Sequence, residues 1–196
     1  MRDSANWSSS PKAFPCTRRC ACALVPRRPA PVWSAPPRPV SFRQDFQPGP
    51  VGVVSRSGTL SYEVSGGLSA AGIGQSTVVG LGADPVVGTD ITDLLQSFDD
   101  DPQTSVVVLI GEVGGSQEER AAHFVREHMQ TPVVAYIAGR CAVPGVAMGH
   151  AGALVREGSG TVDDKIAALE AAGIRVAATP AGVVELVKEH ELAVAV

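Results

Sequence analysis

Short apolar runs alternate with helical patterns from residue 51 onward, and this alternation constrains the fold more than any other feature of the chain. Runs that suit buried strands lie at 51–55, 77–81, 105–110, 133–138 and 175–177. Apolar residues between these runs recur at helical spacing. Strands that alternate with helices of this length pair in parallel through right-handed crossovers. We therefore predict an α/β fold with one flavodoxin-like open parallel sheet and helices on both faces.

Local signals indicate where several of the helices begin. Asp90 has the residue type of an N-cap, and apolar residues on a single helical face follow it. Ser116 and Glu119 have the spacing of a capping box, which predicts a helix over 116–129. A last helix is predicted over 181–190.

The first fifty residues are a different kind of sequence from the rest. They hold eight Lys or Arg against two Asp and ten of the fifteen prolines, whereas residues 51–196 hold eight basic against eighteen acidic residues. No apolar periodicity accompanies these prolines, so the segment cannot bury enough surface to become ordered. We predict a disordered Pro/Arg-rich head over 1–45 and a single domain over 46–196.

Three interpretations of this head are a nucleic-acid arm, a targeting peptide and sequence with no evolved role. We favour the last, because 27–39 is too rich in proline for an amphipathic helix and a basic arm would bind phosphate backbones without specificity. Cys16, Cys20 and Cys22 lack a second ligand pair for zinc, and with Cys141 alone they form no disulfide framework. No apolar run reaches the ~20 residues that span a bilayer. We expect no nucleic-acid partner, no membrane, no metal and a cytoplasmic location.

Four glycine-rich loops are predicted at the sheet edge where the carboxyl ends of the strands meet. They cover 55–59, 82–89, 111–116 and 138–150. In the first loop, Ser57, Gly58 and Thr59 stand at a helix N-terminus, where unpaired N–H groups and the helix dipole favour an anion such as phosphate. The alternative is that Ser57 or Thr59 only caps the helix.

Two further residues are candidates for chemistry at this edge. Glu112 follows a buried strand directly, and its carboxylate could accept a hydrogen bond from an imidazole and so fix the ring tautomer. Alternatively, it only solvates the strand end. His150 has small neighbours that leave its ring accessible, although a histidine beside glycine is also an ordinary loop residue. The other histidines lie in helical segments and are interpreted as surface residues: His123, His128 and His190.

Four motifs in these loops resemble the alpha subunit of succinyl-CoA synthetase in their order and spacing. They are GVVSRSGTL at 52–60, GADP at 82–85, IGEVGG at 110–115 and MGHAG at 148–152. The resemblance extends from residue 46 to residue 190, and four motifs in register are far more specific than a single glycine loop.

The resemblance implies a role for each candidate residue. His150 matches the histidine that takes a phosphoryl group from a nucleoside triphosphate and passes it to succinate, after which coenzyme A displaces the phosphate. Glu112 matches the glutamate that orients this histidine, and 57–59 match the helix N-terminus that holds the phosphohistidine. Tyr62 matches a position assigned to substrate.

The resemblance also implies partners. A beta subunit, in a heterodimer or heterotetramer, would bring ATP or GTP with magnesium, so no cofactor is expected to bind this chain tightly. Coenzyme A would be a substrate, but the family's upstream coenzyme A-binding domain has no match in residues 1–45, and we expect it to be missing.

The activity implied is that of a succinate-CoA ligase component in the tricarboxylic acid cycle, which forms succinyl-CoA, nucleoside diphosphate and phosphate. One alternative is a non-catalytic truncated remnant that pairs with a beta subunit but binds no coenzyme A. Another is a nucleoside diphosphate-forming acetyl- or acyl-CoA ligase, or a citrate-cleaving relative. A flavin module is disfavoured, because no aromatic platform accompanies the strand ends.

Overall fold

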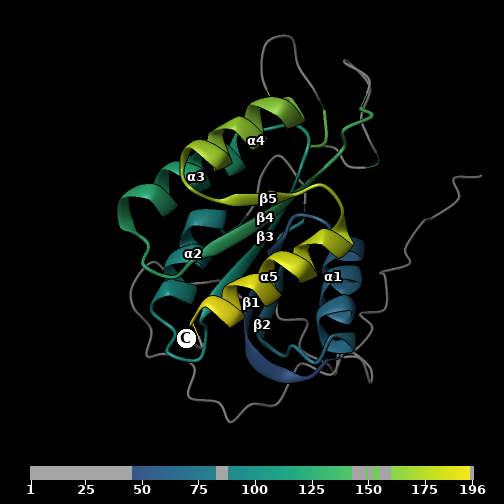
Figure 1. Ribbon diagram of the computed structural model, residues 1–196. Coiled ribbons are helices and arrows are strands. Elements are labelled where there is room, and N and C mark those ends of the chain that lie inside the picture. The colour runs from purple at the N-terminus through teal and green to yellow at the C-terminus, as the bar shows by residue number, and fades with distance from the viewer. Residues whose placement is uncertain (1–45, 83–87, 143–148, 150–151, 155–159, 195–196) are drawn as a thin grey trace, which may run out of the picture.

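In the part of the chain that the structure describes, five parallel strands form one sheet in the order β2-β1-β3-β4-β5, shown in the computed structural model of Figure 1. The structure describes residues 46–82, 88–142, 149, 152–154 and 160–194. The strands are β1 (Pro48–Ser55), β2 (Gln75–Gly80), β3 (Val106–Glu112), β4 (Val133–Ala138) and β5 (Arg175–Ala177). This order and direction confirm the predicted flavodoxin-like open parallel sheet.

Helices cover both faces of the sheet, as predicted. They are α1 (Gly58–Ala70), α2 (Ile91–Asp99), α3 (Gln117–His128), α4 (Val162–Ala171) and α5 (Pro180–Val194). α1 and α5 pack side by side on one face, while α2, α3 and α4 lie on the other (Figure 1). The predicted head over 1–45 lies outside the described residues, and no helix among those described is long and apolar enough to cross a membrane.

The central strands are buried because helices cover both of their faces. All seven residues of β3 are buried, and its neighbour β1 is buried from Val51 to Ser55. Alternate residues of β3 enter the two cores: Val107 and Leu109 face α2 and α3, whereas Val108 and Ile110 face α1 and α5. Burial of each such side chain stabilises the fold by roughly 1.5–3 kcal/mol.

β1 begins three residues before the apolar run that predicted it. The additional residues include Pro48 and Pro50, which break the apolar pattern and have no backbone N–H to donate. Pro50 joins the sheet through its carbonyl group, which accepts from Ser105 N at 2.9 Å, while Pro48 pairs with Gln75 of β2. The register with β2 shifts at Val51. A periodicity argument therefore places the start of this strand too late.

The N-termini of α2 and α3 differ in how they are capped. Asp90 and Asp93 form a complete capping box at α2, which confirms Asp90 as the N-cap. The predicted capping box at α3 is wrong, because the Ser116 side chain makes no cap hydrogen bond. Its Oγ instead accepts from Arg120 Nη1 at 3.0 Å, while Glu119 binds Lys165.

The two central strands send the chain to opposite faces of the sheet. The chain leaves β1 for α1 on one face and leaves β3 for α3 on the other. Such a topological switch point opens a crevice at the carboxyl ends of the strands, where ligands bind in open α/β sheets.

Candidate functional site

The N-terminus of α1 lies at one side of this crevice, directly after β1. Ser57 is the N-cap, and its Oγ accepts a hydrogen bond from Leu60 N at 3.4 Å. Ser55 Oγ braces the turn, because it accepts from Ser57 N at 3.0 Å and donates to Ser57 O at 2.7 Å. Ser57 is thus a helix cap, as its alternative interpretation stated.

Capping by Ser57 leaves room for an anion at the same helix end. Gly58 and Thr59 are exposed, and their N–H groups belong to the first turn, where a helix has no partner of its own for them. Apart from its chain neighbours and the backbone of its own helix, no described atom lies within 4 Å of a Cβ placed on Gly58. Open space and outward N–H groups are what an anion needs at a helix N-terminus. Tyr62, half exposed, lies one turn further along α1.

Glu112, the last residue of β3, lies at the other side of the crevice and is only 6% exposed. Its Oε1 is 3.6 Å from Nη2 of Arg56, the residue that precedes the α1 cap. This burial against a guanidinium does not fit the alternative in which Glu112 only solvates the strand end. The chain then turns through Gly114 and Gly115, whose φ angles of 88° and 66° favour glycine.

His150 lies outside the described residues, but residues shortly after it contact the turn that follows Glu112. A side-chain carbon on Gly114 would collide with the carbonyl oxygen of Gly152 and would lie 2.6 Å from Leu154 N. Gly114 N also donates to Gly160 O at 2.8 Å. The segments over 152–154 and at 160 therefore pack on the glycine turn next to Glu112.

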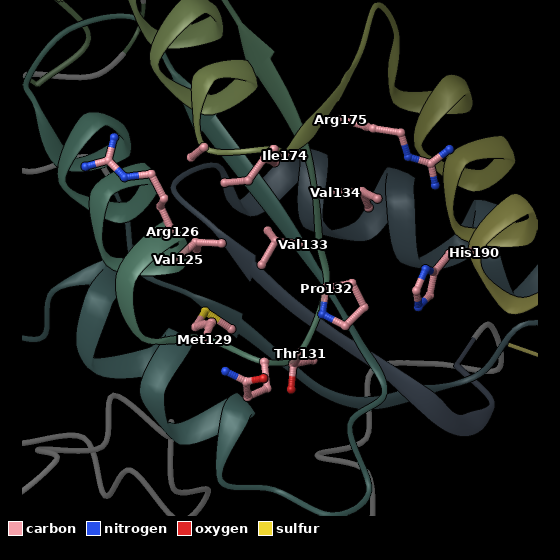
Figure 2. A pocket seen from close by; sticks show the side chains of 13 residues that line it. Val125, Arg126, Met129, Thr131, Pro132, Val133, Val134, Ile174, Arg175 and His190 are labelled. Carbon is pink, nitrogen blue, oxygen red and sulfur yellow. The ribbon is translucent and has the colours of Figure 1, made fainter. Parts of the chain in front are cut away.

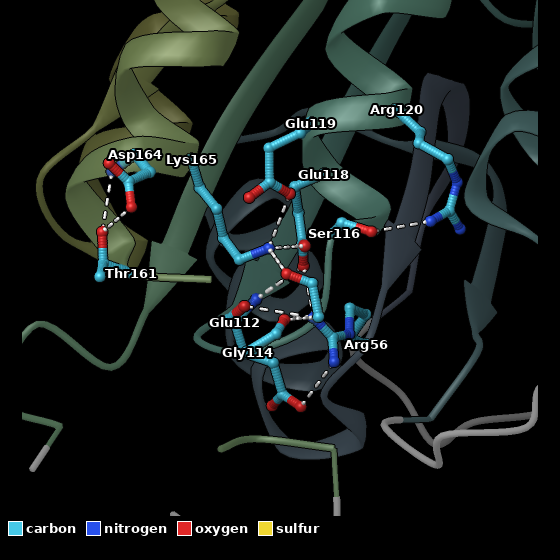
Figure 3. Close-up of polar contacts among 11 residues, drawn as sticks. Arg56, Glu112, Gly114, Ser116, Glu118, Glu119, Arg120, Thr161, Asp164 and Lys165 are labelled. Atoms are coloured by element: carbon cyan, nitrogen blue, oxygen red, sulfur yellow. Dashed lines mark hydrogen bonds and ion pairs between the residues drawn. The ribbon is translucent and has the colours of Figure 1, made fainter. Parts of the chain in front are cut away.

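A buried charged network that sequence reasoning missed lies beneath this turn (Figure 3). Its centre is Glu118 on α3, whose side chain is fully buried. Glu118 Oε1 accepts from Arg56 Nη1 at 2.8 Å and from Glu112 N at 3.1 Å, and Oε2 accepts from Lys165 Nζ at 2.5 Å. Glu119 adds a second carboxylate to Lys165 at 2.9 Å. Side chains from the turn after β1, from α3 and from α4 thus converge on one point.

The same cations also bind the backbone of the glycine turn. Arg56 Nη1 donates to Gly114 O at 2.9 Å and to Glu112 O at 3.2 Å, and Lys165 Nζ donates to Gly115 O at 3.0 Å. Because both side chains are at least 97% buried, water does not compete effectively for these contacts.

The burial of Lys165 could be predicted from its helical spacing, although a charged residue is ordinarily assigned to the surface. Lys165 lies three residues after Val162 and four before Leu169, and both of these residues are buried in the core. Residues at such spacing share one face of a helix, so Lys165 falls on the buried face of α4.

A pocket away from these residues is lined by the start of β4 and β5 (Figure 2). Pro132, Val133, Ile174 and Arg175 form part of its wall, together with residues of α3 and α5. These residues stand at the amino ends of the strands, opposite the edge that holds Glu112. The pocket therefore does not belong to the crevice at the switch point.

The fold and this crevice define an α/β domain of the kind that binds ligands at the carboxyl edge of its sheet, and sequence comparison identifies the family. The CoA-ligase family profile matches residues 54–175. The match covers well over half of the chain, and the protein belongs to the CoA-ligase family.

Curated relatives and solved structures agree with this assignment. The chain is 57% identical over 146 residues to subunit alpha 2 of the ADP-forming succinate–CoA ligase of Archaeoglobus fulgidus, covering 74% of this chain and 50% of that subunit. The chain spans about half the length of the curated relatives it matches.

Two solved structures share the fold at lower identity. ATP citrate lyase from Methanothrix soehngenii, in complex with citrate and coenzyme A, superposes with a TM-score of 0.70 at 28% identity, over 75% of this chain and 25% of that one. An acetyl-coenzyme A synthetase from Candidatus Korarchaeum cryptofilum gives a TM-score of 0.53 at 28% identity, over 69% of this chain and 28% of that one.

Proposed function

We propose that this protein is the alpha-subunit component of a succinate-CoA ligase and carries the phosphoryl group on His150. The observation that carries the proposal is the packing of 152–154 against the turn at Gly114. Because this turn follows Glu112 directly, the contact ties the chain close to His150 to the carboxylate that would orient its ring. The N-terminus of α1 would complete the site as the phosphate cradle.

Each group in this site has a distinct task in the proposed reaction. Glu112 accepts a hydrogen bond from one ring nitrogen of His150, which leaves the lone pair of the other nitrogen to attack the γ-phosphorus of ATP or GTP. The bond to the nucleoside diphosphate breaks, and a phosphoramidate remains on the ring. The N–H groups of Gly58 and Thr59 stabilise the transferred negative charge.

The second half of the reaction moves the phosphoryl group to the acid. A carboxylate oxygen of succinate attacks phosphorus and the N–P bond breaks, which gives succinyl phosphate and neutral histidine. The coenzyme A thiolate then attacks the acyl carbon and expels phosphate. Tyr62 is half exposed one turn from the α1 cap, where it could contact the acid.

We propose that polypeptide outside the described residues binds the nucleotide, magnesium and coenzyme A and brings them to this site. Magnesium would arrive with the nucleotide on a beta subunit, as the resemblance to the family implies. Coenzyme A would be bound outside the segment that matches the relatives. Succinate is favoured over citrate or acetate as the acid, because identity to the succinate–CoA ligase subunit is 57% against 28% for the other two proteins.

Phosphorylation with a beta subunit tests this function. The chain is incubated with the beta subunit of an archaeal succinate–CoA ligase and ATP labelled at the γ-phosphate. Acid-labile label is expected on the native chain and absent from His150→Asn. His123→Asn is the matched control, since His123 is exposed on α3, and it should retain the label. Equal labelling of His150→Asn would refute the assignment of the phosphoryl carrier.

Acceptor specificity is tested on the labelled protein. Succinate should discharge the label, whereas citrate and acetate should leave it in place. If only citrate or only acetate discharged the label, that acid and not succinate would be the phosphoryl acceptor. Formation of succinyl-CoA on addition of coenzyme A would exclude the truncated, non-catalytic alternative.

A further inference from the structure

We propose that Arg56 and Glu118 are positioning residues that set Glu112 at a fixed place relative to the N-terminus of α1. The inference rests on the proposed function, because it assigns these residues a part in phosphoryl transfer without contact with the reacting atoms. Lys165, on α4, supports Glu118 through an ion pair.

The first observation is that the network binds the backbone of Glu112 from two directions. Glu118 Oε1 accepts from Glu112 N at 3.1 Å, while Arg56 Nη1 donates to Glu112 O at 3.2 Å. Both the N–H and the carbonyl of this residue are therefore fixed by charged side chains. Because the backbone of Glu112 has little freedom to rotate, the point from which its side chain extends is also fixed.

The second observation is that one side chain connects the two sides of the crevice. Arg56 is the residue before Ser57, and its own backbone N donates to Ile110 O at 2.9 Å. Its guanidinium reaches Glu112, Gly114 and Glu118. A movement of the Arg56 side chain would thus change the separation between Glu112 and the helix end that would hold phosphate.

The third observation is the way charge is balanced around Glu118. Its two carboxylate oxygens are divided between two cations, with Arg56 on Oε1 and Lys165 on Oε2. Lys165 also holds Gly115 O, so the turn is bound from the α4 side as well. The planar guanidinium fork can serve several acceptors at once, whereas an ammonium group acts as a point charge.

Arg56→Lys and Glu118→Gln test the inference, because the first keeps the charge but loses the guanidinium fork, and the second keeps the shape but loses the charge. Arg120→Lys is the matched control: Arg120, on α3, pairs with the carboxylate of Asp90, but its side chain is 51% exposed. For each variant two quantities are measured with the full chain. They are the rate of phosphohistidine formation with the beta subunit and ATP, and the amide hydrogen exchange of 112–116 compared with that of β4.

The expected result is a local effect. Arg56→Lys and Glu118→Gln should slow phosphohistidine formation at saturating ATP by up to about 100-fold, the loss that follows from a displacement of about 1 Å at a reacting group. KM for ATP should stay unchanged, because the nucleotide is held elsewhere. Exchange should accelerate at 112–116 and not in β4, and Arg120→Lys should match the native chain in every measurement.

Three results would overturn the inference. The first is a native rate of phosphorylation in both variants, and the second is unchanged exchange at 112–116. The third is equal acceleration of exchange in β4 and at 112–116, because the network would then stabilise the whole fold and not one loop. If the native chain itself acquires no label, the proposed function fails, and the exchange data still decide whether Arg56 and Glu118 position Glu112.

Discussion

Replacement of Lys165 by methionine should destabilise the fold strongly, because it removes one partner from a buried ionic network. The Lys165 ammonium serves three acceptors and its side chain is fully buried. Methionine fills a similar volume but leaves Glu118 Oε2 and Gly115 O without their donor. Loss of one partner from a buried ion pair costs roughly 3–5 kcal/mol.

The lower part of this range is expected for Lys165→Met, because Glu118 keeps its two hydrogen bonds on Oε1. Urea unfolding followed by far-UV circular dichroism measures the change. Lys188→Met is the control: Lys188 forms an exposed pair with Glu185 at 3.1 Å, and loss of such a pair costs no more than about 1 kcal/mol.

A double-mutant cycle separates the ionic effect from a loss of packing. In Glu118→Gln with Lys165→Met, the buried carboxylate that would lose its cation is replaced by a neutral amide, so the double variant should lose less stability than the sum of the single variants. A coupling energy of about 2 kcal/mol is expected for side chains in one network. Additive losses, or a Lys165→Met variant within about 1 kcal/mol of the native protein, would refute the reasoning.

Three other substitutions test the packing and the electrostatics of the fold. In urea unfolding, Gly114→Ala should lower the free energy of unfolding by well over the roughly 1 kcal/mol expected for Gly72→Ala. Both glycines have a positive φ, but only a side chain added at Gly114 would meet backbone atoms. Leu95→Ala should cost roughly 2–5 kcal/mol, because Leu95 is fully buried under the sheet. Burial alone would raise the pKa of Asp99, but hydrogen bonds from Thr131 and its neighbour lower it below the ordinary value of 3.8. Asp99→Asn should therefore cost about 1 kcal/mol at pH 7, and unfolding curves should converge with the native ones as the pH falls below 3.8.

The architecture could be predicted from the sequence because its signals are local and repeated. The continuous apolar run of β3 indicates a strand covered on both faces, and its recurrence between helices implies parallel pairing. The start of β1 could not be predicted in this way. Pro50 enters the sheet through its carbonyl group, and a backbone contact of this kind carries no side-chain pattern.

The candidate site was predictable only in part, because its supporting residues depend on contacts between distant segments. Glu112 is conspicuous as an acid at the end of an apolar run. Glu118 and Glu119 instead resemble a solvated first turn, where acids are common for the helix dipole alone. Lys165, forty-seven residues beyond Glu118, gives these acids their partner, and the same contact removes Glu119 from the expected capping box with Ser116.

The position of Arg56 explains why a charged network stands where an α/β sheet usually keeps apolar residues. At the switch point, α1 and α3 diverge to opposite faces, and Arg56 follows the end of β1 beside β3, where its backbone N donates to Ile110 O. A residue there must reach sideways under the crevice, and the long guanidinium of Arg56 does so while it binds two carbonyl groups of the β3 turn. An apolar residue of equal volume could fill the space, but the two carbonyl groups would lose their Arg56 donor and Glu118 would keep only Lys165 of its two cations, at a cost for each buried group. The topology that opens a binding crevice thus also requires a polar support beneath it, which ties the order of the Glu112 turn to the first helix.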